Sequence, residues 1–401
     1  MNIILFDDPV IRQNLLPLTF TRPVAEIRVG ILTITEKWAA YMGAPVSFLT
    51  QPYLQEKYPA AAGNHNLYIN GAVCPDVYLV KEIRTLAAGE AMYHGETLMA
   101  INAGNQQFQN VQELTNHNPG QRRDFPHSTI IREVWEIFTR NGEQIRADFK
   151  LVTDGRKSQS VNDKFTAVYK EENIFIEEGA KIRAAVLNAE DGPIYIGKHA
   201  YVQEGALIKG PFALCEGSHV NMGGKMRGDV TVGPHSKVGG EISASVIFGY
   251  TNKGHDGFLG NSVLGEWCNL GADTNTSNLK NNYADVKLWN YAKGGFKSTG
   301  QQFCGLIMGD HSKCGINTMF NTGTVVGVSS NIFGTGFPRN FIPSFSWGGA
   351  AGFETYQLRK VYEVAEKVME RRKKDLNEIE KNILSEVFEQ TQQYRIWDKR
   401  G

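Results

Sequence analysis

The chain contains a stretch, from Ile196 to Val238, in which every sixth residue is apolar. Its eight members are Ile196, Val202, Ile208, Leu214, Val220, Met226, Val232 and Val238. The residues between them are mostly glycine, alanine, serine, charged or amide residues. One helix or one strand does not produce this period. It is typical of the hexapeptide repeat of a β-solenoid, in which short parallel strands each point one side chain inward and a corner follows each strand.

The six-residue step extends beyond this stretch in both directions. Ile176 and Ile182 open it, and the register breaks over 249–261. The apolar residues that resume the step are Leu264 and Leu270, then Met308, Cys314, Phe320, Val326 and Ile332. Residues 280–302 are too polar and too long for a coil corner. We therefore expect a left-handed parallel β-helix over 176–340, with arms inserted at 249–261 and 280–302.

The flanking segments predict other structure. Residues 1–155 read as an α/β domain. Strands are expected at 3–6, 46–49 and 67–70, helices at 31–41, 82–88 and 130–138, and a loop at 103–123. Residues 156–175 are polar and predict a linker.

Residues 352–397 predict amphipathic C-terminal helices, which need the solenoid or a neighbouring subunit to cover their apolar side. The charged run Met369–Lys374 is interpreted as a solvated helix face rather than an anion site.

Composition excludes some partners. The 401 residues carry 42 Lys and Arg against 42 Asp and Glu, so no global charge indicates nucleic acid or an acidic membrane. The five cysteines follow no ligand spacing, and the sequence shows no signal peptide or long apolar run. These features predict a cytoplasmic protein with reduced thiols.

A non-repeat segment carries the candidate chemistry. A histidine is followed three residues later by an aromatic residue, then by Leu-Gly, Asn-Leu-Gly-Ala and a second asparagine nine residues after the first. These residues are His255, Phe258, Asn269, Ala272 and Asn278. The segment resembles the acetyltransferase half of the bifunctional glucosamine-1-phosphate acetyltransferase/N-acetylglucosamine-1-phosphate uridylyltransferases, most closely their Bacteroidetes form.

Acetyl transfer to a sugar amine needs a base that works near neutral pH, and histidine is suited to it. The resemblance implies that His255 is that base and that the Ala272 N–H stabilises the oxyanion. It also implies that Asn278 and Asn269 bind the acetyl donor and the sugar, and that acetyl-CoA lies between the solenoids of a homotrimer. The alternative for His255 is a surface histidine without a task, and asparagines also line solenoid corners for structural reasons.

The sequence departs from this family at its phosphate ligands. Phe258 lacks the hydroxyl of the usual tyrosine, and Ser243 stands where the family has a lysine. The replacement candidates, among which the sequence does not choose, are Lys253, Lys280, Lys225 and Arg227.

The N-terminal part resembles sugar-1-phosphate nucleotidyltransferases through Leu16–Thr19 and Thr21–Pro23. No glycine lies between Leu5 and Leu16, and Ala72 replaces a metal-binding carboxylate of the family. If the domain is active, it uses UTP and Mg²⁺. The phosphate candidates are Arg12, Arg22, Arg28 and Lys37, and the metal candidates are Asp7, Asp8 and Asp76. The alternative is that these charges solvate an ordinary surface.

Three functions therefore stay open: a bifunctional enzyme making UDP-N-acetylglucosamine, an acetyltransferase with an inactive N-terminal domain, and a glucose-1-phosphate thymidylyl- or adenylyltransferase whose solenoid only oligomerises it. All three use small-molecule partners, namely a sugar phosphate, a nucleoside triphosphate or an acyl-CoA, and no membrane.

Overall fold

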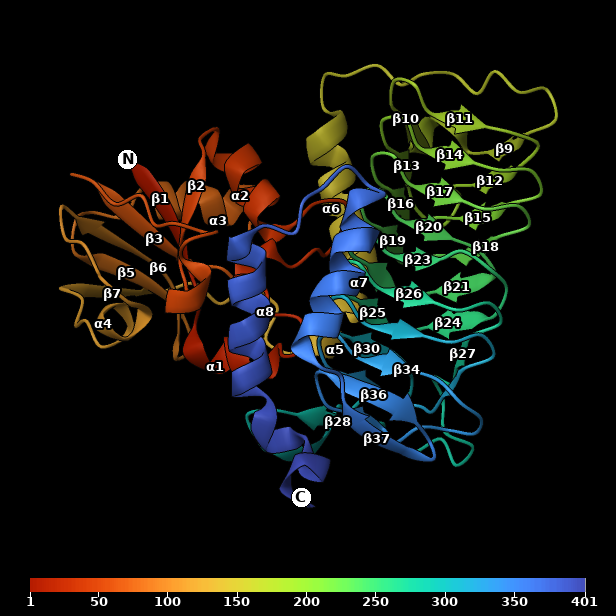
Figure 1. Ribbon diagram of the computed structural model, residues 1–401. Coiled ribbons are helices and arrows are strands. Elements are labelled where there is room, and N and C mark those ends of the chain that lie inside the picture. Colours follow the sequence, from red (N-terminus) through yellow and green to blue (C-terminus); the bar gives the residue numbers. More distant parts are fainter. Residues whose placement is uncertain (401) are drawn as a thin grey trace. The chain divides into compact units, whose positions relative to one another are not determined.

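The computed structural model describes residues 1–400, with side chains described as far as Asp398 (Figure 1). The chain forms two compact units. The first comprises residues 1–28 and 32–133, and the second comprises residues 29–31 and 134–401. Each unit is described separately below.

The first unit is an α/β domain around a mixed six-stranded sheet in the order β2-β1-β3-β6-β5-β7. Its strands are β1 (Asn2–Phe6), β2 (Val46–Leu49), β3 (Asn66–Asn70), β5 (Glu90–His94), β6 (Thr97–Gly104) and β7 (Gln121–Asp124). Strands β2 and β3 flank β1 in parallel, and β6 runs antiparallel to β3 and β5. A short antiparallel pair is formed by β4 (Val73–Cys74) and β8 (Thr129–Ile130).

The helices of this unit are α1 (Pro9–Asn14), α2 (Ile34–Met42), α3 (Val77–Arg84) and α4 (Val111–Thr115), with 3-10 turns η1 (Val24–Glu26) and η2 (Pro52–Leu54). The three predicted strands are confirmed. Helix α3 begins earlier than predicted because the Asp76 side chain accepts hydrogen bonds from the N–H groups of Tyr78 and Leu79 and caps it. The predicted loop at 103–123 contains α4 and β7.

The second unit is a left-handed parallel β-helix with three faces. The first face consists of β10 (Ile174–Ile176), β13 (Ile194–Ile196), β16 (Phe212–Leu214), β19 (Val230–Val232), β22 (Val246–Ile247), β25 (Val263–Leu264), β30 (Leu306–Met308), β33 (Thr324–Val326) and β35 (Phe341–Ile342). The second face consists of β11 (Lys181–Ile182), β14 (Tyr201–Val202), β17 (His219–Val220), β20 (Lys237–Val238), β23 (Asn252–Lys253), β26 (Asn269–Leu270), β31 (Lys313–Cys314), β34 (Asn331–Ile332), β36 (Ser346–Gly349) and the antiparallel β37 (Gly352–Thr355).

The third face consists of β9 (Ala167–Tyr169), β12 (Val186–Asn188), β15 (Leu207–Lys209), β18 (Lys225–Arg227), β21 (Glu241–Ser243) and β24 (Phe258–Gly260). The pair β27 (Asn275–Thr276) and β32 (Met319–Phe320) continues it, since β27 contacts β24. The predicted linker at 156–175 therefore already contributes the solenoid strand β9, preceding the 3-10 turn η3 (Glu171–Asn173).

The sixfold pattern is the core of this unit, as predicted. All eight residues from Ile196 to Val238 are exposed by 2% or less, and they belong to one continuous apolar cluster. Cys314 also points inward, and all five cysteines are buried free thiols. Burying each aliphatic side chain contributes about 1.5–3 kcal/mol, so the stack of inward residues is the main source of the solenoid's stability.

Residues 249–261 form a regular coil, which corrects the prediction of an arm there. Strands β23 and β24 pair in parallel with β20 and β21 of the preceding coil. The apolar step is hidden because the inward residue is Lys253 and because the corner between Val238 and Ile242 is short. Gly240 in that corner has φ +70° and lies against the backbone of Gly257, so a side chain there would clash.

The second predicted insertion, residues 280–302, leaves the repeat as an antiparallel hairpin of β28 (Lys287–Asn290) and β29 (Gly295–Ser298). Helices α5 (Val134–Thr139) and α6 (Asn141–Thr153) belong to the second compact unit. Asn141 connects α6 to the solenoid: its amide donates to the Asp229 carbonyl at 2.9 Å and its Oδ1 accepts from Thr231 at 3.1 Å.

Two amphipathic helices follow the solenoid, as predicted. They are α7 (Leu358–Glu370) and α8 (Glu378–Gln390), followed by the 3-10 turns η4 (Gln392–Tyr394) and η5 (Ile396–Arg400). Figure 1 shows α7 alongside the solenoid. Helix α7 buries Val361, Ala365 and Met369. Across the described residues, no helix combines the length and apolar character needed to cross a membrane.

Candidate functional site

His255 and Ala272 lie at one corner of the solenoid, between its second and third faces. The turn 254–257 carries His255 and connects β23 to β24, and the turn 271–274 carries Ala272 and connects β26 to β27. Asn252 pairs with Asn269 across the two coils, so the turns stack. His255 and Ala272 therefore occupy the same corner position in adjacent coils, which are about 4.8 Å apart.

The His255 turn is fixed by side chains from several coils. The Asn221 amide donates to the Gly254 carbonyl at 2.7 Å, and the Phe258 N–H donates to Asn275 Oδ1 at 2.8 Å. The backbone around His255 is thus held in place, while its imidazole is exposed and makes no hydrogen bond with any described residue. A fixed backbone with a free side chain is what a positioned proton acceptor requires.

Lys253 lies inside the solenoid, which corrects its prediction as a phosphate ligand. It is 1% exposed, and its Nζ donates to the carbonyls of His255 at 2.6 Å, Asp256 at 3.0 Å and Gly239 at 3.4 Å. Burial lowers the pKa of Lys253 to about 8, against the attraction of nearby Asp256. Two of these hydrogen bonds support the His255 turn and the third supports the corner of the preceding coil, so Nζ cannot reach a ligand outside.

The remaining predicted residues of this region lie on the second face and along the third face. Asn269 is exposed on the second face, one coil after Asn252. Phe258 is half-buried on β24. Asn278 lies beyond the end of β27, and its amide donates to Asn261 Oδ1 at 2.8 Å.

The Ala272 N–H donates to no acceptor within residues 1–400, so it is available to a ligand. The N–H groups of Glu204 and Met222, at the same corner of earlier coils, are equally uncommitted. What distinguishes Ala272 is therefore the histidine one coil away. Met222 and Ile316 at this corner are 69% and 70% exposed and give it an apolar rim.

Two other phosphate candidates are used elsewhere. Lys280 Nζ donates to the Asp285 carbonyl at 2.8 Å and holds its own loop. Arg227 pairs with Glu241 at 2.8 Å on the third face, and Lys225 is exposed beside it on β18. None of these contacts places a cation at the His255 turn.

The charged run Arg371–Lys374, which the sequence predicts to be a solvated helix face, lies near the His255 corner. The connection between α7 and α8 contacts the second face, where Arg372 Nη2 lies 3.4 Å from Asn252 Oδ1. Arg372 is followed and preceded by further cations in the run Arg371–Lys374. The only sequence signal for this contact was a run of four cations between two amphipathic helices.

The carboxylates proposed to bind metal in the first unit all accept hydrogen bonds from the protein itself. Asp7 is buried, accepts hydrogen bonds from Thr50 at 2.5 Å and the Val24 N–H at 2.7 Å, and pairs with Arg12 at 3.2 Å. Burial raises the pKa of Asp7, although Arg12 and these hydrogen bonds oppose the effect.

Asp8 and Asp76 cap the N-termini of α1 and α3. Among the described residues there is no group of three His, Cys, Asp or Glu side chains that could hold a metal ion. We assign no reaction step to a bound Mg²⁺.

The predicted phosphate-facing cations are also buried rather than displayed. Arg12 contacts the Tyr53 hydroxyl at 2.9 Å in addition to Asp7, and Arg28 pairs with Glu36 at 3.3 Å. Arg22 and Lys37 are exposed by 5% and 1%. All four side chains are buried in this structure, so they do not form a surface cluster.

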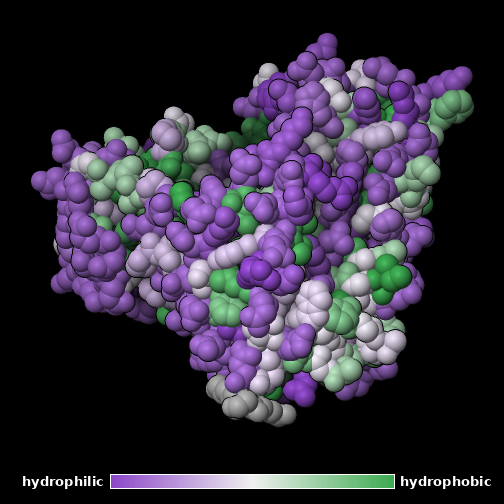
Figure 2. All heavy atoms as spheres, in the orientation of Figure 1, coloured by the Kyte–Doolittle hydropathy of each residue, from purple (hydrophilic) through white to green (hydrophobic). Residues whose placement is uncertain are grey.

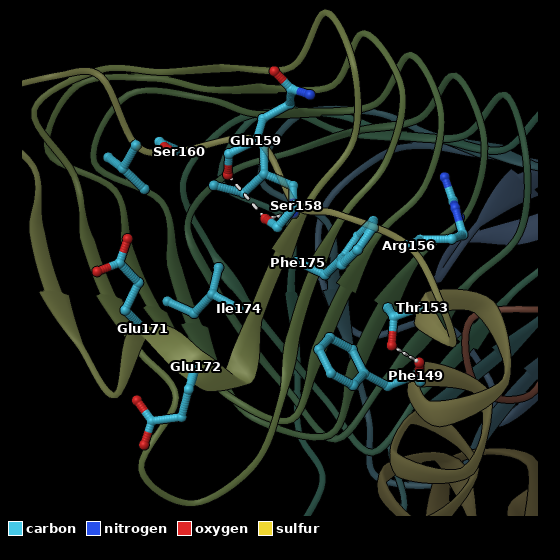
Figure 3. Close-up of a pocket in the computed structure, with 12 residues that line it drawn as sticks. Phe149, Thr153, Arg156, Ser158, Gln159, Ser160, Glu171, Glu172, Ile174 and Phe175 are labelled. Atoms are coloured by element: carbon cyan, nitrogen blue, oxygen red, sulfur yellow. Dashed lines mark hydrogen bonds between the residues drawn. The ribbon is translucent and has the colours of Figure 1, made fainter.

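A separate cavity of about 370 Å³ lies at the first coil of the solenoid (Figure 3). Phe149 and Thr153 of α6, Arg156 and the strand β10 line it. The Arg156 guanidinium lies over the Phe175 ring and pairs with Glu177 at 2.6 Å. No candidate acetyltransferase residue lines this cavity, and on the second face four coil steps separate β11 from β23.

Comparisons with known proteins give one family match and several partial matches to bifunctional enzymes. Residues 3–157 match the model of the family described as sugar nucleotidyl transferase, a range that ends close to the predicted border at 155. The chain is 37% identical over 87 residues to the bifunctional protein GlmU of Methanocaldococcus jannaschii, covering 22% of this chain and 21% of that protein. It is 29% identical over 160 residues to a bifunctional sugar-1-phosphate nucleotidylyltransferase/acetyltransferase of Sulfurisphaera tokodaii, covering 39% of this chain and 37% of that protein.

The chain thus spans between about a fifth and just over a third of the length of these relatives. Among solved structures, a variant of AntD, an N-acyltransferase from Bacillus cereus in complex with dTDP and coenzyme A, covers 51% of this chain and 91% of its own at 14% identity, with a TM-score of 0.22. That similarity is too low to contribute to the assignment. Residues 3–157 thus match the sugar nucleotidyl transferase family model, and the chain is similar over part of its length to bifunctional nucleotidylyltransferase/acetyltransferases.

Proposed function

We propose that the solenoid transfers an acetyl group from acetyl-CoA to glucosamine-1-phosphate, and that the N-terminal domain then transfers a uridylyl group from UTP to the product. The observation that supports the first step best is the corner shared by His255 and the free N–H of Ala272, one coil apart. The partial match to bifunctional nucleotidylyltransferase/acetyltransferases supports the combination of both steps in one chain.

In the acetyl transfer, the sugar amine attacks the thioester carbonyl carbon while His255 accepts a proton from the nitrogen. The N–C bond forms, the C–S bond breaks, and the proton passes to the leaving thiolate. The Ala272 N–H donates to the oxygen that becomes negatively charged. Asn269 and Asn278 are proposed to orient sugar and donor, and the apolar rim at Met222 and Ile316 suits the uncharged arm of coenzyme A.

For the N-terminal domain, the family match supports nucleotidyl transfer. The alternative is an acetyltransferase whose N-terminal domain only binds or scaffolds. The commitment of Asp7 and Arg12 to each other is the specific observation in its favour.

One assay separates these outcomes. Purified protein is given glucosamine-1-phosphate, acetyl-CoA and the magnesium complex of UTP, and thiol release and pyrophosphate release are followed separately. We expect both products, with pyrophosphate appearing only after acetylation. Thiol without pyrophosphate would establish the acetyltransferase alone, and pyrophosphate without thiol would overturn the role of the His255 corner.

A further inference from the structure

The segment between α7 and α8 brings a concentrated positive charge to the solenoid. Arg371, Arg372, Lys373 and Lys374 follow directly after α7. Met369 before them and Leu376 after them are both buried, so the run is anchored at each end. The Tyr362 hydroxyl on α7 also donates to the Lys381 carbonyl on α8 at 2.9 Å, which connects the two helices.

The charges of this run are uncompensated. None of the four side chains forms an ion pair with any residue from 1 to 398, and the neighbouring Glu370 pairs with Lys367 at 3.0 Å. Arg371, Lys373 and Lys374 are exposed, and Arg372 is half-buried. Figure 2 shows that the surface over α7 and its connection to α8 is strongly hydrophilic. Holding four cations together without a counter-charge costs free energy unless an anion binds.

The surroundings reflect this positive potential. Burial and the adjacent Arg371 lower the pKa of Arg372. The pKa of His219 on the second face is lowered by burial first and then by Lys237 and Arg372. The pKa of His235 is likewise lowered by burial, with Arg372 and Lys374 adding to the effect against Glu216.

The run also lies close to the candidate acetyl-transfer corner. Arg372 contacts Asn252, which pairs with Asn269 on the next coil. His255 follows Asn252 by three residues, a path of at most about 10 Å along the chain. A ligand bound at the corner can therefore reach the cations with a phosphate group while its reacting atoms stay at His255.

We propose that Arg371–Lys374, positioned by the contact of Arg372 with Asn252, form the phosphate-binding site of the acetyltransferase. This inference rests on the proposed function and replaces the phosphate ligands that Lys253, Lys280 and Arg227 do not supply. The chemistry recognised is a phosphate monoester dianion. It comes either from the sugar phosphate or from coenzyme A.

The test compares Arg372→Gln and the double substitution Arg371→Gln/Lys374→Gln with the wild type. The matched control is Arg359→Gln, which removes one cation from α7 at a side chain that is 81% exposed. KM is measured for glucosamine-1-phosphate and for acetyl-CoA. Because a charge-assisted hydrogen bond to phosphate is lost, we expect KM for one substrate to rise about 10-fold to 100-fold, with kcat changed less than about 3-fold.

Ligands without the phosphate identify its source. Glucosamine replaces glucosamine-1-phosphate in one arm, and dephospho-coenzyme A replaces coenzyme A in the other. In the arm that supplies the phosphate, Arg372→Gln should cause no further loss, because the interaction is already absent. Equal losses with and without the phosphate in both arms would overturn the proposal, as would wild-type KM values in both variants.

Direct binding separates this inference from the proposed function. Calorimetry measures coenzyme A and glucosamine-1-phosphate binding to His255→Ala protein, which needs no turnover. If that protein binds neither ligand, the proposed function fails. If it binds both and adding Arg372→Gln leaves both affinities unchanged, the phosphate site fails and the proposed function stands. An unchanged melting temperature confirms that the exposed substitutions leave the fold intact.

Discussion

At the scale of single residues, the corner around His255 combines a rigid turn with an exposed side chain. The turn is rigid because a buried lysine donates to its carbonyls, a role that charged residues rarely take inside a solenoid. Both residues therefore give sharp tests.

Substitution of His255 by alanine removes the proposed proton acceptor. We expect acetyl transfer to fall by about 10²–10⁴-fold, while coenzyme A affinity changes little, since the imidazole acts on the amine. Steady-state kinetics and calorimetry measure the two quantities. His199→Ala is the control, because it removes another exposed imidazole from a solenoid corner. Full activity in folded His255→Ala protein would exclude the assignment.

Lys253 makes the stability of the solenoid depend on pH. Its pKa is about 8 in the folded protein, below the ordinary value near 10.5, so the unfolded chain binds the proton more tightly. Above pH 10.5 Lys253 is neutral in both states and does not lower the free energy of unfolding. As the pH falls from 10.5 to 8, the unfolded chain takes up the proton first, and the free energy of unfolding decreases. Relative to Lys253→Met, the wild type should gain about 3 kcal/mol in free energy of unfolding from pH 7 to 10.5. Denaturant titrations at several pH values measure this gain, and parallel curves for the two proteins would contradict it.

At the scale of elements, each short strand is stabilised by the one side chain that it points inward. Strand β15 shows this within three residues: Ile208 is 2% exposed and Leu207 is 48% exposed. The alternation follows from the strand geometry, in which successive side chains point to opposite faces.

These two neighbours form a matched pair. Ile208→Ala should lower the free energy of unfolding by about 2–5 kcal/mol, because it leaves a cavity in the stack. Leu207→Ala should change it by less than about 0.5 kcal/mol. Chemical denaturation followed by circular dichroism measures both variants. Similar losses would show that the inward stack does not dominate the stability of the coil.

At the scale of the whole molecule, we propose a trimer. Hexapeptide acyltransferases, which the solenoid resembles, use the cleft between neighbouring solenoids for coenzyme A, and the exposed Met222 and Ile316 stand at the corner where such a neighbour would lie. Light scattering at micromolar concentration should give three times 44.6 kDa, about 134 kDa. A monomer under those conditions would count against a site shared between subunits.

The amino-acid sequence alone determined the repeat, because the inward positions of a solenoid recur at a fixed local spacing. It also determined the strands β1, β2 and β3, the amphipathic character of α7 and α8, and the motif residues of the His255 corner, all of which are local signals.

The tertiary structure decided what depends on distant contacts. In the sequence, the inward-pointing Lys253 looked like a break in the repeat. Only the stacked coils bring the backbone carbonyls that accept its hydrogen bonds. The sequence offered Asp7 as a metal-ligand candidate, and only the structure shows that it contacts Arg12 and Thr50. The run Arg371–Lys374 read as solvated charge, because its partner Asn252 lies 120 residues earlier. No local pattern records which surface a helix connection covers, so the sequence could name these residues but not bring them together.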